Sequence, residues 1–140
     1  MLKIVFDTNI IVSALLNKKG LPALLVALAI ENGKLQLFYS PALMAEYERV
    51  LKREKFDFDP KDTKEILSKI KRAGIEVLPK KTITLITEDP EDNRILEAGE
   101  EAQADYIITG DKSHFPFDKI TKPFIVTPRE FVVREEARLK

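Results

Sequence analysis

Short apolar segments of strand length alternate with helical segments along the whole chain. Strand-like runs occupy residues 2–6, 35–39, 75–78, 105–109 and 124–126, and residues 83–86 form a further short extended piece. Helical patterns occupy residues 10–16, 21–30, 41–56, 61–73 and 90–103, and a last helix opens at residues 127–128. Strands that alternate with helices are typical of a parallel sheet covered by helices on both faces. We therefore predict an α/β fold, a three-layer α/β/α sandwich with a mostly parallel central sheet.

Length, charge balance and cysteine usage narrow the class of protein further. A chain of 140 residues is predicted to form one domain over residues 1–140. The 23 Lys and Arg residues balance the 23 Asp and Glu residues, so net charge gives no argument for nucleic-acid binding. The chain has no cysteine, which excludes disulfides and thiolate metal sites and favours the reducing cytoplasm. No apolar run approaches the roughly 18 residues of a membrane span, so we expect no membrane association.

Two aspartates follow predicted strands. Asp7 comes directly after the strand at residues 2–6, and Asp111 follows the strand at residues 105–109 after one glycine. In parallel α/β sheets, sites form at the carboxyl ends of the strands, where the strand order reverses. This edge of the sheet is therefore the predicted position of a functional site.

Glu46 lies on the apolar face of a predicted helix. It stands three residues after Leu43 and four residues before Val50, so the three side chains share one face. A buried carboxylate is costly unless it is paired or bound to a cation. Two interpretations are open here: a buried site residue, or a residue at the edge of the stripe whose carboxylate reaches water.

Asp92 raises the same question on a second helix, because it precedes the apolar residues Ile95 and Leu96 by three and four positions. Here helix capping is an alternative. The chain repeats one helix opening at residues 59–62, 89–92 and 127–130, with an N-cap residue, a proline and an acid at the third helical position. Capping explains Asp89 well and Asp92 in part. Asp89 is therefore assigned mainly to capping and secondarily to the site.

One α/β core can bring four carboxylates to the same edge: Asp7, Glu46, Asp92 and Asp111. Like charges at close range raise one another's pKa and repel, so such a cluster needs a cation. Oxygen ligands without cysteine or histidine suit Mg²⁺ or Mn²⁺ better than zinc. Such an ion activates water and stabilises the departing oxygen in phosphodiester cleavage.

These acids belong to an ordered set of motifs. The set comprises Asp7-Thr8-Asn9 after a first strand, Ser40-Pro41 followed by Glu46, Asp89-Pro90-Glu91-Asp92-Asn93, and Ala104-Asp105 leading to Thr109-Gly110-Asp111. In this order and spacing it resembles the PIN-domain nucleases over nearly the whole chain, and most closely the small single-domain toxins of toxin–antitoxin pairs. The resemblance implies a Mg²⁺- or Mn²⁺-dependent endoribonuclease that cleaves RNA. It also implies a homodimer and inhibition by an antitoxin protein.

The resemblance also implies roles for single residues. The four acids match the metal-binding positions of the family. Asn9 matches a small polar residue that orients Asp7 or a metal-bound water, and Thr109 matches a hydroxyl that bonds an acid or a phosphate. Asn93 is either a partner of Asp92 or a solvated helix residue. His114, the single histidine, is either a phosphate contact or an ordinary surface residue of a loop.

Three alternatives to a toxin nuclease remain at this stage. One is an RNA-processing nuclease on the same fold, and another is a non-catalytic interaction module, against which the four intact acids argue. The third is a protein in which Asp7 accepts a phosphoryl group, as in phosphatases or receiver domains on similar sheets. A phosphatase of that kind needs a second acid two residues on, where this chain has Asn9.

Overall fold

The central element is an all-parallel sheet in the order β3-β2-β1-β4-β5. A computed structural model describes residues 1–31, 33–115, 120 and 122–139 of the chain. The strands of this described part are β1 (Leu2–Phe6), β2 (Leu35–Tyr39), β3 (Ile75–Glu76), β4 (Tyr106–Ile108) and β5 (Phe124–Val126). The first strand lies in the middle, with β2 and β3 on one side and β4 and β5 on the other. The strand order therefore reverses between β1 and β4.

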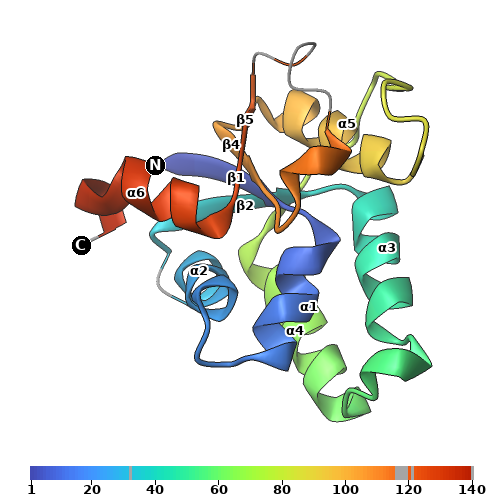
Figure 1. Ribbon diagram of the computed structural model, residues 1–140, viewed down its shortest axis with the longest axis vertical. Helices are drawn as coiled ribbons and strands as arrows, with labels where there is room; N and C mark the ends of the chain where they lie inside the picture. The colour runs from blue at the N-terminus through green and yellow to red at the C-terminus, as the bar shows by residue number, and fades with distance from the viewer. Residues whose placement is uncertain (32, 116–119, 121, 140) are drawn as a thin grey trace.

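Helices cover both faces of this sheet. They are α1 (Thr8–Leu16), α2 (Leu21–Ile30), α3 (Pro41–Leu51), α4 (Pro60–Ala73), α5 (Asp92–Ala102) and α6 (Pro128–Leu139). Figure 1 shows α5 on one face and α1, α2 and α4 on the other, while α3 stands at the side and contacts both α1 and α5. This arrangement confirms the predicted three-layer α/β/α sandwich, with a sheet that is parallel throughout its described strands.

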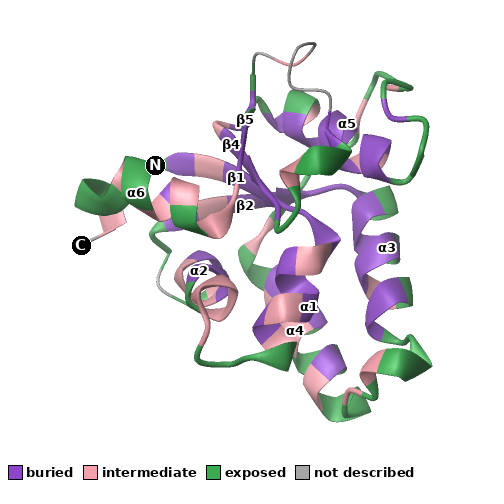
Figure 2. Ribbon diagram, in the orientation of Figure 1, coloured by how far each residue is buried: buried purple, intermediate pink, exposed green. Residues whose placement is uncertain are grey.

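The core lies on both faces of β1, β2 and β4, as the buried residues in Figure 2 show. Ile4 and Phe6 of β1 are fully buried, as expected for a strand covered on both sides. Tyr47 of α3 is also fully buried, and its hydroxyl donates a hydrogen bond of 2.5 Å to the carbonyl of Phe6. This bond joins α3 to the carboxyl end of β1. It therefore brings the neighbouring Glu46 to the edge where Asp7 lies.

Several predicted boundaries are wrong. The helix predicted over residues 41–56 ends at Leu51, and a separate 3-10 turn, η1 (Glu54–Phe56), follows. Residues 52–55 are all charged, so they offer no apolar face that could pack the helix against the core. The backbone of Arg53 is extended, and this ends the helix. The strand predicted at residues 75–78 is shorter, Ile75–Glu76, and the helix predicted from residue 90 begins at Asp92.

Residues 83–86 form no strand. Their backbone groups instead bond to side chains of α5: the amide of Ile83 donates to Glu97 at 2.8 Å. The amide of Ile86 donates to the Asn93 side chain at 2.9 Å, and that side chain donates back to the Ile86 carbonyl at 2.8 Å. Side chains of α5 thus replace a neighbouring strand as the partner of this segment.

In the described residues, no single helix is long and apolar enough to cross a membrane. The helices α1 and α2 meet that test only as a pair, and they are bent by 110° relative to each other.

Candidate active site

Asp7 lies at the point where the strand order reverses. It directly follows β1, and its amide continues the sheet by donating to the carbonyl of Ile108 in β4 at 2.9 Å. Thr109 follows β4 at the same edge and is completely buried. Asp7 and Thr109 thus meet at the carboxyl ends of the strands, the edge at which a site was predicted.

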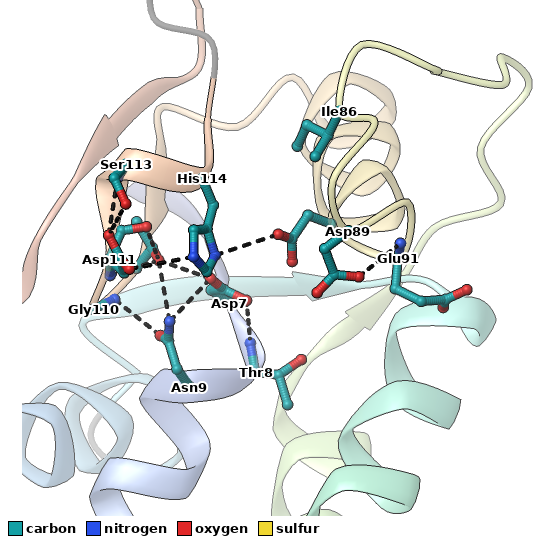
Figure 3. Close-up of polar contacts among 12 residues, drawn as sticks. Asp7, Thr8, Asn9, Ile86, Asp89, Glu91, Gly110, Asp111, Ser113 and His114 are labelled. Carbon is teal, nitrogen blue, oxygen red and sulfur yellow. Dashed lines mark hydrogen bonds and ion pairs between the residues drawn. The ribbon is translucent and has the colours of Figure 1, made fainter.

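Both oxygens of the Asp7 carboxylate accept hydrogen bonds. Oδ1 accepts from the amide of Thr8 at 2.7 Å, which makes Asp7 the N-cap of α1. Oδ2 accepts from the Thr109 hydroxyl at 2.7 Å and from the Asn9 amide group at 3.2 Å (Figure 3). Asn9 also accepts from the amide of Gly110 at 2.9 Å. Asn9 and Thr109 thus hold Asp7 in place, as the resemblance implied.

Burial dominates the electrostatics of Asp7. The residue is only 5% exposed, and this desolvation raises the pKa of its carboxyl above the usual range. The hydrogen bonds from Thr109 and Thr8 oppose that rise because they stabilise the charged form.

Glu46 is a buried acid rather than an exposed residue at the edge of the apolar stripe. It is 7% exposed, and the Thr8 hydroxyl donates a hydrogen bond of 2.6 Å to its Oε2. Burial raises the pKa of Glu46, the Thr8 bond lowers it, and the nearby charge of Asp7 raises it further. Arg49, at 3.8 Å from Oε1, is a distant and exposed partner. Thr8 therefore links Glu46 to the site, a role that the sequence did not reveal.

Asp92 begins α5 and is 6% exposed. Its Oδ2 atom is buried and has no hydrogen-bond partner within the described parts of the chain. Burial, followed by the charges of Asp7 and Asp89, raises the pKa of Asp92 to about 7. Helix capping does not account for this carboxylate, because no backbone amide of the described residues donates to it.

Asp89 is not the N-cap of α5 as predicted, because the helix begins two residues later and its N-cap is Glu91, which makes no side-chain cap bond. Oδ1 of Asp89 accepts from the amide of Glu91 at 3.3 Å, and the Asp89 carbonyl accepts from the amide of Asp92 at 3.0 Å. These bonds close the turn before α5. The Asp89 carboxylate nevertheless lies close enough to Asp92 and Asp7 to raise the pKa of each.

Asp111 is exposed, whereas Asp7, Glu46 and Asp92 are buried. Its Oδ1 accepts from the amide and the hydroxyl of Ser113, at 3.0 and 2.5 Å. Its Oδ2 lies 3.3 Å from Nε2 of His114, in the 3-10 turn η2 (Lys112–His114). These hydrogen bonds lower the pKa of Asp111, opposite to the other three acids.

His114 lies within the candidate site, a position that the local sequence pattern indicated only weakly. Figure 3 shows its ring between Asp111 and the start of α5. Its Nδ1 lies 3.6 Å from Oδ2 of Asp92, while Nε2 faces Asp111. Its spacing of three residues after Asp111 is a signal, because residues i and i+3 of a 3-10 turn lie above one another.

One open cavity of about 220 Å³ joins most of these groups. Its polar lining consists of Asp7, Thr8, Asn9, Glu46, Arg53, Asp89, Asp92 and His114, and its apolar lining of Val12, Val50 and Phe56. Asp111 does not line this cavity and is connected to it through His114. Asn93 is buried with its side chain bonded to Ile86, so it is neither a solvated residue nor bonded to one of the acids.

The donor set of this cavity suits a hard divalent cation. In the described residues, no three His, Asp or Glu side chains converge closely enough to enclose an ion as they stand. The buried, unpartnered Oδ2 of Asp92 is nevertheless an atom that requires a partner, and carboxylate oxygens are the ligands that Mg²⁺ and Mn²⁺ prefer. The residues present therefore fit such an ion.

Comparison with known proteins agrees with this geometry. A family profile described as PIN domain matches residues 3–113, from β1 to the turn that follows Asp111. An uncharacterized protein of Methanocaldococcus jannaschii, MJ1680, is 28% identical over 142 aligned positions, which cover 94% of this chain and 90% of the relative. The profile spans well over half of the chain, so this protein belongs to the PIN-domain family, whose members are generally metal-dependent nucleases.

Proposed function

We propose that this protein is a Mg²⁺- or Mn²⁺-dependent endoribonuclease that hydrolyses RNA phosphodiester bonds at the acid cavity. The observation that carries the proposal is the Asp92 carboxylate, which is buried with one oxygen unpartnered in the same cavity as Asp7 and Glu46. Three buried acids with raised pKa values repel one another, and a bound cation removes that cost.

The chain's own residues prepare the site for this reaction. Asp7, Glu46 and Asp92 would hold the ion, and Asp111 lies beside the cavity, next to His114. Thr109 and Asn9 fix the Asp7 carboxylate, and Thr8 fixes that of Glu46, so the ligands are oriented before the ion arrives. A bound ion supplies an activated water and stabilises the charge on the departing oxygen.

Arg53 supplies the positive charge that a phosphate group needs. It is an exposed side chain on the rim of the cavity. Its position allows it to contact the RNA backbone beside the acids, while the apolar Val50 and Phe56 line the cavity next to it.

The direct test is cleavage of a single-stranded RNA oligonucleotide by the purified full chain, with Mg²⁺, with Mn²⁺ and with EDTA. A DNA oligonucleotide of the same sequence is the matched substrate control. The proposal expects internal cleavage of RNA only when metal is present, and much slower cleavage of DNA. An intact RNA in both metals, or equal cleavage in EDTA, would contradict it.

We also propose the biological setting that the resemblance to small single-domain PIN proteins suggests. In this setting residues 1–140 form one domain, and the enzyme acts in the cytoplasm as the homodimeric toxin of a toxin–antitoxin pair. Induced expression in a bacterial host should then arrest growth, and co-expression of an adjacent small gene should relieve the arrest. An RNA-processing nuclease is the alternative, and it would cleave RNA without arresting growth.

A further inference from the structure

His114 is the one group in the described site that contacts both Asp92 and Asp111. Its Nδ1 is 3.6 Å from Oδ2 of Asp92, and its Nε2 is 3.3 Å from Oδ2 of Asp111. It lines the acid cavity together with Asp7 and Glu46, whereas Asp111 does not. A residue in this position can act on whatever the cavity binds.

We infer that His114 is a nitrogen ligand of the metal ion, through Nδ1, and that Asp111 is a positioning residue which orients His114 and does not itself bind the ion. The inference rests on the proposed metal-dependent function and specifies the ligands of that same site.

The surroundings of Nδ1 support the assignment of His114 as a metal ligand. This nitrogen faces the Asp92 oxygen that is buried without a hydrogen bond. Two neighbouring ligand atoms, each about 2.1 Å from an octahedral ion, lie about 3 Å apart. The observed separation of 3.6 Å is slightly larger, so a small movement of the half-exposed His114 side chain lets both atoms reach one ion.

The surroundings of Nε2 support the assignment of Asp111 as the residue that orients His114. A histidine that binds a metal generally donates its other N–H to a carboxylate, and this fixes the ring orientation and the tautomer. Asp111 is placed to be that carboxylate, because its Oδ2 faces Nε2 while its Oδ1 is held by two hydrogen bonds from Ser113. With the Nε2 proton donated to Asp111, the lone pair of Nδ1 is directed to the cavity.

The turn that carries both residues is also fixed in place. Lys112 in η2 donates a hydrogen bond of 2.9 Å to Glu130 of α6, and Glu130 in turn forms a reciprocal capping pair with Thr127. His114 is therefore presented from a turn that is anchored to the C-terminal helix.

One imidazole changes the chemistry of an otherwise all-oxygen site. Nitrogen is a softer donor than a carboxylate oxygen, and divalent transition metals accept it more readily than Mg²⁺ does. The inference therefore expects this protein to prefer Mn²⁺ over Mg²⁺, and to lose most of that preference when His114 is replaced.

Pulsed electron paramagnetic resonance of bound Mn²⁺ tests this directly, since it detects a nitrogen-14 nucleus coordinated to the ion. His114 is the single histidine of the chain, so in protein without a histidine tag an imidazole signal can come only from this residue. We expect the signal in the wild-type protein and none in His114→Ala or His114→Gln. Circular dichroism of the variants confirms that they are folded.

Titrations of Mn²⁺ and Mg²⁺ binding complete the test. We expect His114→Ala to weaken Mn²⁺ binding by about 10-fold or more and Mg²⁺ binding less. Asp111→Ala should weaken Mn²⁺ binding about 10- to 100-fold, the effect of losing an outer-shell partner. Asp111→Asn should restore part of the affinity and the nitrogen signal, because its amide oxygen still accepts the Nε2 proton. Glu65→Gln, in an exposed acid outside the cavity, is the control and should change neither quantity.

Two results would overturn the inference and leave the proposed function intact. One is tight Mn²⁺ binding in the wild-type protein without a nitrogen signal. The other is a loss of Mn²⁺ binding in Asp111→Ala that is as complete as in Asp7→Asn while His114→Ala binds normally. If the wild-type protein binds neither ion and cleaves no RNA, the proposed function itself fails.

Discussion

Two of the acid-lined hollows in the described part of the chain differ in how their acids are held. The first is the acid cavity with Asp7, Glu46 and Asp92. The second is a hollow of about 190 Å³ between α2 and α4, whose acidic residues are Glu31, Asp62 and Glu65. The number of carboxylates is similar in the two regions, so acid content alone does not distinguish them.

The difference lies in burial and in the nearest cation. Between α2 and α4, Lys69 lies 3.1 Å from Glu65 and 3.7 Å from Glu31, and Lys18 lies 3.9 Å from Asp62. The hydrogen bond from Lys69 lowers the pKa of Glu65. In the acid cavity, burial instead raises the pKa of Asp7, Glu46 and Asp92. An acid cluster becomes a candidate cation site when the protein buries it and leaves a carboxylate oxygen without a hydrogen-bond partner, as it does with Oδ2 of Asp92.

The largest expected effect is the loss of activity in Asp7→Asn. This substitution removes a negatively charged ligand at the centre of the acid cavity. We expect cleavage of RNA with Mg²⁺ or Mn²⁺ to fall by more than the roughly 10- to 100-fold caused by losing an outer-shell partner. A cleavage assay with saturating metal measures this. Activity close to that of the wild-type protein would remove Asp7 from the site.

Glu46→Gln, compared with Glu48→Gln, sharpens the comparison on a single helix. Glu46 is buried beside Thr8, whereas Glu48 points to Lys71 of α4 at 2.9 Å. We expect Glu46→Gln to remove both cleavage and the increase in melting temperature on adding metal. Glu48→Gln should retain both, since an exposed ion pair contributes only about 0–1 kcal/mol to stability. Equal effects at the two positions would show that the response belongs to α3 as a whole.

Metal addition should stabilise the folded protein. A ligand that binds only the folded state at 100 times its Kd adds about 2.7 kcal/mol to the free energy of unfolding. Thermal unfolding in EDTA and in millimolar Mn²⁺ measures this for the wild-type protein. Coincident unfolding curves would mean that the acid cavity binds no metal under these conditions.

The raised pKa of Asp92 should make the free energy of unfolding depend on pH. The pKa of Asp92 is raised to about 7 in the folded state, so the folded protein binds more protons than the unfolded chain between about pH 4 and pH 7. In EDTA, stability should therefore fall as the pH rises through this range. Asp92→Asn should flatten the curve and melt at a higher temperature than the wild-type protein near pH 8. Parallel curves for the two proteins would contradict the raised pKa.

The smallest effect is expected for Glu65→Gln in the hollow between α2 and α4. Its carboxylate is exposed, and its partner Lys69 also lies near Glu31. Cleavage and metal response should both equal those of the wild-type protein. A clear loss of either quantity would mean that the second hollow takes part in the function.

The sequence alone predicted the layers, the strands and the edge at which the acids lie. These features depend on local patterns: apolar runs of strand length, helical periodicity, and an acid directly after a strand. The predicted bounds of β1, β2 and β5 agree with the structure. The helix α3 was predicted too long, because a run of charged residues has no periodicity that marks where a helix stops.

Only the tertiary structure decided how the acids are partnered. Thr8 reaches Glu46 across 38 residues of sequence, and Thr109 reaches Asp7 across 102. His114 comes between Asp92 and Asp111, so Asp111 stands outside the cavity that the other three acids share. Local sequence patterns determine which segments form and which residues each of them presents. Burial and hydrogen bonding between distant segments are set by packing, and these decide which acids are left in need of a cation.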